Sequence, residues 1–189
     1  MLLSFSNLLR HEVFLRFFNP IFLILIGCAS GQKGTAMKTV DHVNIDRYTE
    51  TWYEIARFPH SFERNLATVT AAYKLKQNGN VSVVNKDFKY SLDGKEQTAK
   101  AFAKIPNPNM PGRLKVYFFW PFGTDYFILD LDPNYQWALV GSGSPNFLWI
   151  LNRTPQMNDE LYNEIVGKAK GLGYDTDKLE RVPQVISKD

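Results

Sequence analysis

Cysteine and histidine are scarce in this chain of 189 residues, which holds one cysteine and three histidines. The single cysteine, Cys28, excludes a disulfide within the chain and a cysteine-rich metal site. His11 falls in an apolar N-terminal segment, so His42 and His60 remain, too few for a metal cluster or an obvious catalytic triad. The sequence therefore predicts no metal and no cofactor, and it gives little support to an enzyme.

A large excess of one charge is also missing, because the formal net charge is only +3 at pH 7. A nucleic-acid-binding surface needs clustered basic residues, and no run of lysine or arginine occurs, so we expect no nucleic-acid partner. Hydrophobic residues make up 44% and aromatic residues 14% of the chain. This composition and length predict one globular domain with a substantial core, without internal repeats.

The first 27 residues have the order of a signal peptide. Positive charge at Arg10 and Arg16 precedes an apolar run over residues 17–26. The run is too short to cross a bilayer and Pro20 interrupts it, whereas a charged region, a short apolar core and small residues at the exit are typical of a signal peptide. We expect residues 1–27 to be removed from the mature protein.

The exit of this run, Leu25-Ile26-Gly27-Cys28, resembles the lipobox of bacterial lipoproteins. The resemblance implies cleavage after Gly27 and acylation of Cys28, and several acyl chains would attach the protein to a membrane effectively permanently. Ala29 stands where an aspartate would imply inner-membrane retention, so the resemblance implies delivery to the bacterial outer membrane, facing the periplasm. Residues 28–40 then form a flexible tether. The alternative is an ordinary secreted protein with an incidental cysteine.

Bulky and smaller side chains alternate over Thr51–Phe58, which predicts a strand with two different faces. Asn78-Gly79 is a strong hairpin signal, because both residues tolerate positive φ. Seven further strands are expected between turn signals, at residues 69–75, 81–86, 97–103, 113–119, 126–130, 137–141 and 147–153. Eight short strands in this order favour an antiparallel meander closed into a barrel or a sandwich.

The pattern changes after the last of these strands. A helix that Asn158 or Asp159 can cap would carry Leu161, Ile165, Val166 and Ala169 on one stripe. A short helical turn near residues 43–48 and a last extended piece near residues 179–182 complete the expected elements.

Three stretches are similar to the signatures of the lipocalin family: Thr51–Phe58, Asp130–Tyr135 and Trp149–Pro155. The resemblance implies an all-β fold, an eight-stranded antiparallel up-and-down barrel with one C-terminal α-helix, over residues 41–189. A lipobox together with Trp-Tyr-Glu-Ile-Ala-Arg resembles the bacterial outer-membrane lipocalins. Glu50 departs from the family, which usually has glycine at this place.

The resemblance assigns structural roles to Trp52, Asp132 and Arg153. Leu131 and Pro133 depart from the family's second signature, so Asp132 is its firm match. A guanidinium stacked on an indole makes a cation–π contact while its donors bond backbone carbonyls. We therefore expect Arg153 over Trp52 to close the floor of the barrel.

Nine side chains are expected to line the barrel interior. Parity with Arg153 on the last strand and with Trp52 on the first gives four of them, and the resemblance to lipocalins implies the other five. They are Ala56, Phe58, Leu114, Val116, Phe118, Tyr126, Ile128, Phe147 and Trp149. This apolar and aromatic lining suits an acyl chain, although the same side chains would also fill a solid core.

The resemblance thus implies a binding protein, anchored in the outer membrane, that holds a fatty acid or a lysophospholipid. An inward Glu54 would need a partner or a proton. Arg57, His60, Arg64 or Arg113 could meet an anionic head group. One alternative is an enzyme acting on an oxidised lipid or epoxide, with Glu54 or Tyr126 as acid or base. Another is a structural tether with a filled barrel, and a homodimer is left open.

Overall fold

The computed structural model describes residues 37–61, 66–89 and 94–184, which belong to one compact unit. The expected signal peptide, Cys28 and most of the expected tether lie outside these residues. Their cleavage, acylation and flexibility therefore stay predictions.

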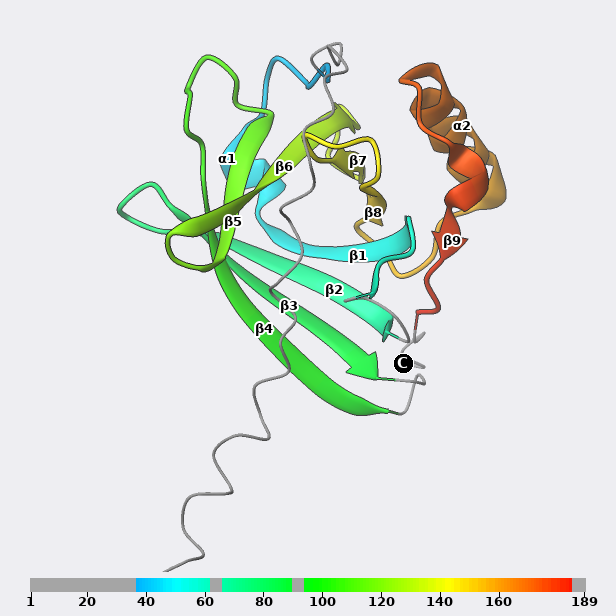
Figure 1. Ribbon diagram of the computed structural model, residues 1–189, viewed down its shortest axis with the longest axis horizontal. Helices are drawn as coiled ribbons and strands as arrows, with labels where there is room; N and C mark the ends of the chain where they lie inside the picture. The colour runs from blue at the N-terminus through cyan, green and yellow to red at the C-terminus, as the bar shows by residue number, and fades with distance from the viewer. Residues whose placement is uncertain (1–36, 62–65, 90–93, 185–189) are drawn as a thin grey trace, which may run out of the picture. The chain divides into compact units, whose positions relative to one another are not determined.

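In the described part of the chain, eight antiparallel strands form a closed barrel and a ninth short strand lies at its seam (Figure 1). From β1 to β8 each strand pairs with the next strand in sequence, and β8 pairs with β1, which completes the ring. The short β9 pairs with β1. The strands are β1 (Glu50–Arg57), β2 (Leu66–Leu75), β3 (Val81–Lys89), β4 (Lys95–Lys104), β5 (Arg113–Phe119), β6 (Phe122–Leu131), β7 (Trp137–Gly141), β8 (Leu148–Asn152) and β9 (Glu180–Arg181). The predicted eight-stranded up-and-down barrel is confirmed.

In the described part of the chain, the helices with described bounds are α1 (Ile45–Tyr48), α2 (Asp159–Gly171) and the 3₁₀ helix η2 (Thr176–Lys178). The Asn158 side chain accepts a hydrogen bond from the Leu161 amide (2.8 Å) and so caps α2 as predicted. Acidic residues in its first turn and lysines in its last turn suit the helix dipole. None of the helices in the described ranges is long and apolar enough to span a membrane.

The turn between β2 and β3 shows why the meander reverses where the sequence predicts. Gly79 has a φ of +77°, a conformation that glycine adopts without steric cost. The Lys76 amide donates to the Asn80 carbonyl (2.8 Å) and the Gly79 amide to the Lys76 carbonyl (2.9 Å). These contacts fix the register in which Val81 pairs with Leu75.

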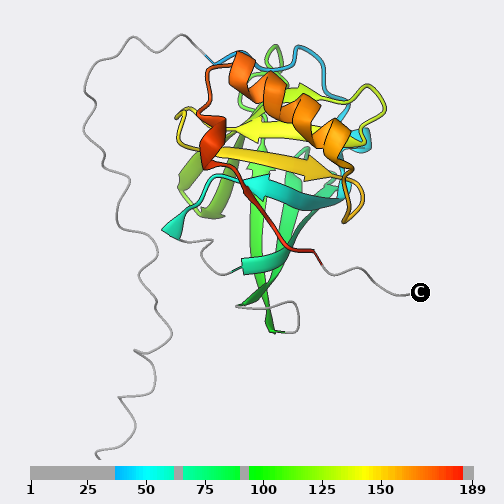
Figure 2. The same ribbon diagram turned by 90° about the vertical axis from the view of Figure 1, so that its right-hand side faces the viewer.

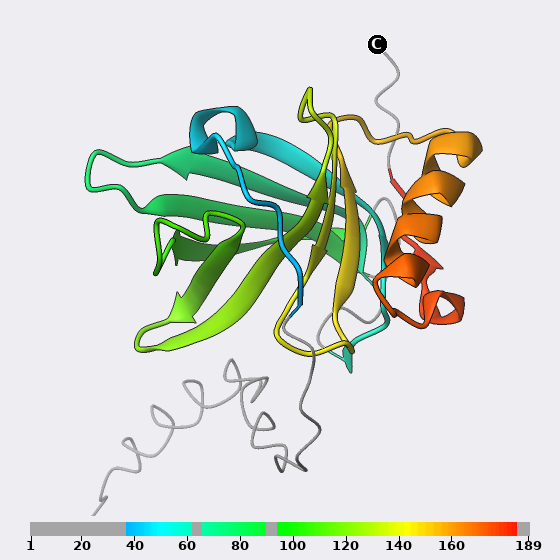
Figure 3. The ribbon, with the colours of Figure 1, turned by 90° about the horizontal axis from the view of Figure 1, so that it is seen from above.

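Two hydrophobic cores follow from the two faces of the sheet. One lies inside the barrel around Trp52 and includes Tyr73, Leu114 and Ile128. The other lies outside, where the outer face of β1, β7 and β8 packs against α2 through Ile150 and other residues. Figures 2 and 3 show α2 running along this outer face, outside the barrel.

A β-bulge in β1 changes which side chains face the interior. The pairing with β8 shifts between Glu54 and Ala56, so Glu54 lies opposite Leu151 and Ala56 opposite Ile150. Leu151 belongs to the inner core and Ile150 to the outer core. The prediction that Ala56 and Phe58 face the interior is therefore wrong, because both pack in the outer core. There the ring centroids of Phe58 and Tyr174 are 6.0 Å apart. The extra residue reverses the alternation that strand parity assumes.

The seam between β1 and β2 is bridged by residues 180–184, which we call the C-terminal strap. β1 and β2 pair only from Glu50 to Tyr53 on β1. Beyond that point the Val182 amide donates to the Ile55 carbonyl (2.9 Å) and the Thr68 amide to the Pro183 carbonyl (2.7 Å). The strap thus supplies the backbone hydrogen bonds that the two diverging strands do not make to each other.

Candidate functional site

The floor of the barrel is built on Trp52 and Arg153. Trp52 is fully buried, and its Nε1 donates to the Tyr48 carbonyl at 2.9 Å. The Arg153 guanidinium carbon lies 3.7 Å from the centre of the indole ring. Arg153 also donates to the carbonyls of Tyr135 (3.0 Å), Thr49 (2.8 Å), Thr51 (3.1 Å) and Arg47 (2.6 Å). One side chain therefore ties α1, β1 and the β6–β7 turn together below the interior.

Asp132 shapes that β6–β7 turn. Its carboxylate accepts hydrogen bonds from the amides of Asn134 (2.9 Å) and Gln136 (3.0 Å). Tyr135 has a φ of +62° within the turn, and the Arg47 guanidinium carbon lies 4.2 Å from the centre of its ring. Asp132 thus stabilises a strained turn, and this turn places the Tyr135 carbonyl where it accepts a hydrogen bond from Arg153.

Glu50 occupies a position whose backbone favours glycine. Its φ is +77°, in the left-handed region where a Cβ atom crowds the following carbonyl. The backbone that leads into β1 thus keeps the conformation that suits the usual glycine. Adopting it with glutamate costs about 1–2 kcal/mol of conformational free energy.

Three tyrosine hydroxyls meet above the floor. The Tyr48 and Tyr126 oxygens are 2.7 Å apart, and Tyr73 donates to Tyr126 at 3.2 Å. Burial raises the pKa of Tyr48 and Tyr126 well above the ordinary value of 10.0, and that of Tyr73 to about 12. The three hydroxyls stay protonated at neutral pH and satisfy one another within an otherwise apolar wall.

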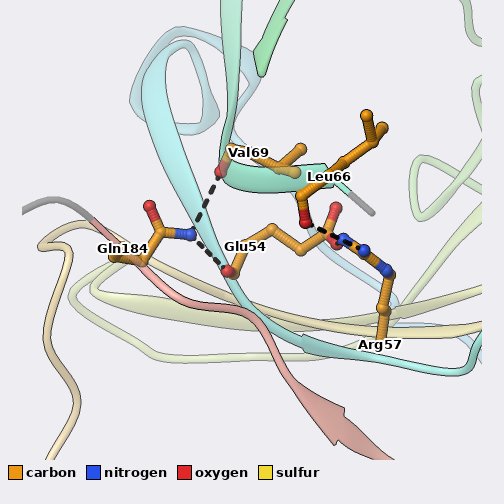
Figure 4. Close-up of polar contacts among 5 residues, drawn as sticks. All are labelled: Glu54, Arg57, Leu66, Val69 and Gln184. Carbon is orange, nitrogen blue, oxygen red and sulfur yellow. Dashed lines mark hydrogen bonds and ion pairs between the residues drawn. The ribbon is translucent and has the colours of Figure 1, made fainter. Parts of the chain in front are cut away.

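A buried ion pair faces the interior from β1 (Figure 4). Because of the bulge, Glu54 and Arg57 point to the same side, and Arg57 Nη1 lies 2.6 Å from Glu54 Oε1. Each residue is only 7% exposed. Burial raises the pKa of Glu54, and the positive charge of Arg57 offsets part of this rise. Glu54 therefore has the partner that an inward carboxylate requires.

The surroundings of this pair fix it further. Arg57 also donates to the Leu66 carbonyl at 3.2 Å. Gln184 of the strap donates to the backbone carbonyls of Glu54 (2.6 Å) and Val69 (3.4 Å), across the seam (Figure 4). The strap thus holds the segment that carries the ion pair.

Arg57 also interacts electrostatically with Asp87 and His60. Val83 on β3 lies in the inner core, so alternation places Asp87 on the same face of that strand. Burial raises the pKa of Asp87, an effect that a hydrogen bond from Gln97 and the charge of Arg57 reduce. Burial and the Arg57 charge both lower the pKa of His60. Glu54, Asp87 and His60 all interact electrostatically with Arg57, and we call these four residues the polar band.

Five of the nine predicted lining residues pack in or against the inner core. They are Leu114, Val116, Tyr126, Ile128 and Trp149. Phe147 stacks on Trp149 (centroids 5.9 Å apart) and on His60 (4.3 Å). Phe118 lies at the end of β5 and is 39% exposed, and Ala56 and Phe58 lie outside the barrel.

Sequence reasoning missed the polar side of this interior. The inward position of Arg57 depends on the bulge, which leaves no periodic signal. The hydroxyl cluster needs Tyr48 and Tyr73, which come from a helical turn and from β2. One signal was available: an inward Glu54 requires a cation, and Arg57 is three residues away.

In residues 37–61, 66–89 and 94–184, no group of three His, Cys, Asp or Glu side chains is arranged so that it could hold a metal ion. The titratable groups inside the barrel are engaged with one another, as the Glu54–Arg57 pair and the hydroxyl cluster show. The arrangement offers an apolar wall, a closed floor and a polar band.

Comparison with known proteins gives consistent matches. Residues 43–184 match the family model of the Lipocalin-like domain. The chain is 38% identical to the outer membrane lipoprotein Blc of Escherichia coli K12 over 162 residues, which cover 85% of this chain and 90% of that protein. Identity to Blc of Vibrio cholerae is 36% over 170 residues, covering 87% and 98% of the two chains. Identity to temperature-induced lipocalin-1 of Arabidopsis thaliana is 38% over 157 residues, covering 78% and 83%.

Solved structures share the fold at lower identity. The cockroach allergen Per a 4 superposes with a TM-score of 0.62 at 21% identity, covering 78% of this chain and 92% of that one. Insecticyanin from Manduca sexta gives a TM-score of 0.62 at 17% identity, covering 80% and 85%.

Proposed function

This chain belongs to the lipocalin-like family, and on that premise we propose that it binds a fatty acid or a lysophospholipid inside its barrel while anchored in the bacterial outer membrane. The observation that carries the proposal is the inner face of the barrel. It combines a floor closed by Trp52 and Arg153, an apolar wall with Trp149, and a polar band around Arg57. An acyl chain matches the wall, and an anionic or zwitterionic head group matches the band.

The anchor rests on the sequence and on the relatives. The chain carries Leu-Ile-Gly-Cys at residues 25–28, and the relatives of E. coli, V. cholerae and Citrobacter freundii are named outer membrane lipoproteins. Acylated Cys28 holds the protein at the outer membrane, and the barrel takes up lipid there.

Binding without catalysis accords with the chemistry of the two residues that an enzyme would use. Glu54 is held by Arg57 at 2.6 Å, and burial keeps the pKa of Tyr126 well above its ordinary value. Tyr126 therefore serves as a hydrogen-bonding hydroxyl rather than as a base at neutral pH.

A pair of neighbouring substitutions on β4 tests the proposal. Ala101 packs against the inner core, whereas Lys100 is exposed on the opposite face of the strand. Ala101→Phe places a ring in the interior and should lower the fraction of protein that carries a co-purified acyl lipid in native mass spectrometry. Lys100→Phe adds the same ring outside and should leave that fraction unchanged. The same spectra report whether the protein is a homodimer.

Two results would contradict lipid binding in the barrel. One is equal lipid occupancy in the two variants. The other is the absence of any bound lipid in wild-type protein purified without detergent, together with no response to a fluorescent fatty acid.

A further inference from the structure

Exposed aromatic side chains gather on one hairpin of the barrel. In the described part of the chain seven large hydrophobic side chains are exposed, and four of them lie between residues 118 and 122. Phe119, Trp120 and Phe122 are 63%, 67% and 65% exposed, and Phe118 is 39% exposed. We call Phe118–Phe122, where β5 turns into β6, the hairpin tip. An apolar cluster of this kind on a soluble domain indicates a surface that meets a partner.

The hairpin tip is held in place by rings on the outer wall of the barrel. Trp120 lies 5.5 Å from Tyr117 and 6.4 Å from Phe102, and the last two rings stack at 4.9 Å. The Tyr117 ring also covers Gly123, where an added Cβ would lie only 2.6 Å from a ring carbon. The tip therefore presents its rings outward from an ordered support.

Lysines lie beside the hairpin tip, on the side of the β2–β3 turn. Lys104 Nζ lies 5.2 Å from the centre of the Trp120 ring. A shallow groove beside Trp120 is lined by Lys76, Asn78, Asn80, Phe102 and Lys104, and the next groove is lined in part by Lys74. Among the described residues, no carboxylate lines either groove. Asp125, an acidic residue of the same hairpin, is paired with Lys115 at 3.0 Å.

We propose that the hairpin tip inserts into the interface of an anionic phospholipid bilayer and gives the barrel a membrane contact separate from the expected anchor at Cys28. Tryptophan and phenylalanine are suited to the boundary between head groups and acyl chains. The neighbouring lysines are attracted by an anionic surface. A second copy of the chain fits the patch less well, because a symmetric contact would bring the same lysines of both copies together.

Quenching of tryptophan fluorescence by brominated lipid tests this contact. The full chain, as isolated from bacterial membranes, is reconstituted in vesicles of phosphatidylethanolamine and phosphatidylglycerol that contain acyl-brominated phosphatidylcholine. Trp52 and Trp137 are 0% and 7% exposed and contribute little to quenching. Trp120 reports on the hairpin tip, and Trp149 reports on lipid held inside the barrel.

We expect strong quenching of wild-type protein, loss of most of it in Trp120→Phe, and retention of the Trp120 component in Trp149→Phe.

Phe119→Ser and Phe122→Ser should each lower the ratio of docked to undocked protein by about tenfold or more, as expected for losing a buried ring. Leu172→Ser is the matched control, because Leu172 is also an exposed hydrophobic residue (37%) but lies next to α2. It should change nothing.

Three results would overturn the inference. The first is quenching that does not change in Trp120→Phe. The second is quenching lost only in Trp149→Phe, which would support lipid in the barrel but leave no docking of the tip. The third is a Trp120 that stays unquenched while the tips of two copies cross-link, which would identify the partner as a second copy.

Discussion

Replacing Arg153 with alanine should cost about 3–5 kcal/mol of unfolding free energy, because this one side chain joins several segments at the floor. The substitution removes a guanidinium 3.7 Å from the Trp52 ring centre and four hydrogen bonds to backbone carbonyls. A partly desolvated cation–π contact accounts for about 1–2 kcal/mol. The carbonyls account for the rest, reduced because those near the barrel end regain water.

Urea unfolding followed by circular dichroism measures the loss, and the melting temperature should fall by about 10 °C for a domain of this size. Arg181→Ala is the matched control. Arg181 also lies over a ring, 3.5 Å from the centre of Tyr162, and pairs with Asp159 at 2.7 Å, but its side chain is 46% exposed. Its loss should cost less than about 1 kcal/mol.

Arg153→Lys separates charge from geometry, because lysine keeps the cation but lacks the planar fork that reaches several carbonyls. It should lose about half as much as Arg153→Ala. Equal costs for Arg153→Ala and Arg181→Ala would refute the view that the floor depends on the stacked guanidinium.

Three further predictions concern β1 and its surroundings. Glu50→Gly should stabilise the fold by about 0.5–1 kcal/mol in urea unfolding, since relief of the strain at the observed positive φ exceeds the extra conformational entropy that glycine loses on folding; a loss of stability would contradict this. Arg57→Met should cost about 3–5 kcal/mol, and adding Glu54→Gln should recover part of it, as a double-mutant cycle would measure; additive losses would argue against a direct pair. The folded-state pKa of His60 is lowered, so its contribution to stability is present above about pH 6.5 and is lost as the pH falls through the lowered value. His60→Phe should therefore flatten the loss of stability on acidification, and identical pH profiles would refute this.

Local signals predicted most of the fold. Alternation over Thr51–Phe58 and the Asn78-Gly79 turn are read within a few residues, and the structure has a strand and a tight turn at these places. The helix after the barrel follows from its stripe and from Asn158, whose side chain caps it. These features depend on backbone preference and on burial of one face, which the sequence expresses directly.

The orientation of side chains beyond the bulge could not be predicted in the same way. The extra residue between Glu54 and Ala56 leaves no mark on the composition of the strand, but it places Ala56 and Phe58 outside and Arg57 inside. The exposure of the hairpin tip could not be predicted either, because the sequence pattern of an aromatic residue in a strand is the same whether the side chain faces a core or a partner. Such features depend on contacts between segments distant in the sequence.

The C-terminal strap has a practical consequence for labelling and purification. An affinity tag inserted next to Gln184 would disturb the seam, because Gln184 joins β1 to β2 through two carbonyls. A tag before Cys28 would be lost with the expected leader. Residues 106–110, between β4 and β5, are all exposed. An epitope inserted there would leave the seam, the floor and the hairpin tip as they are.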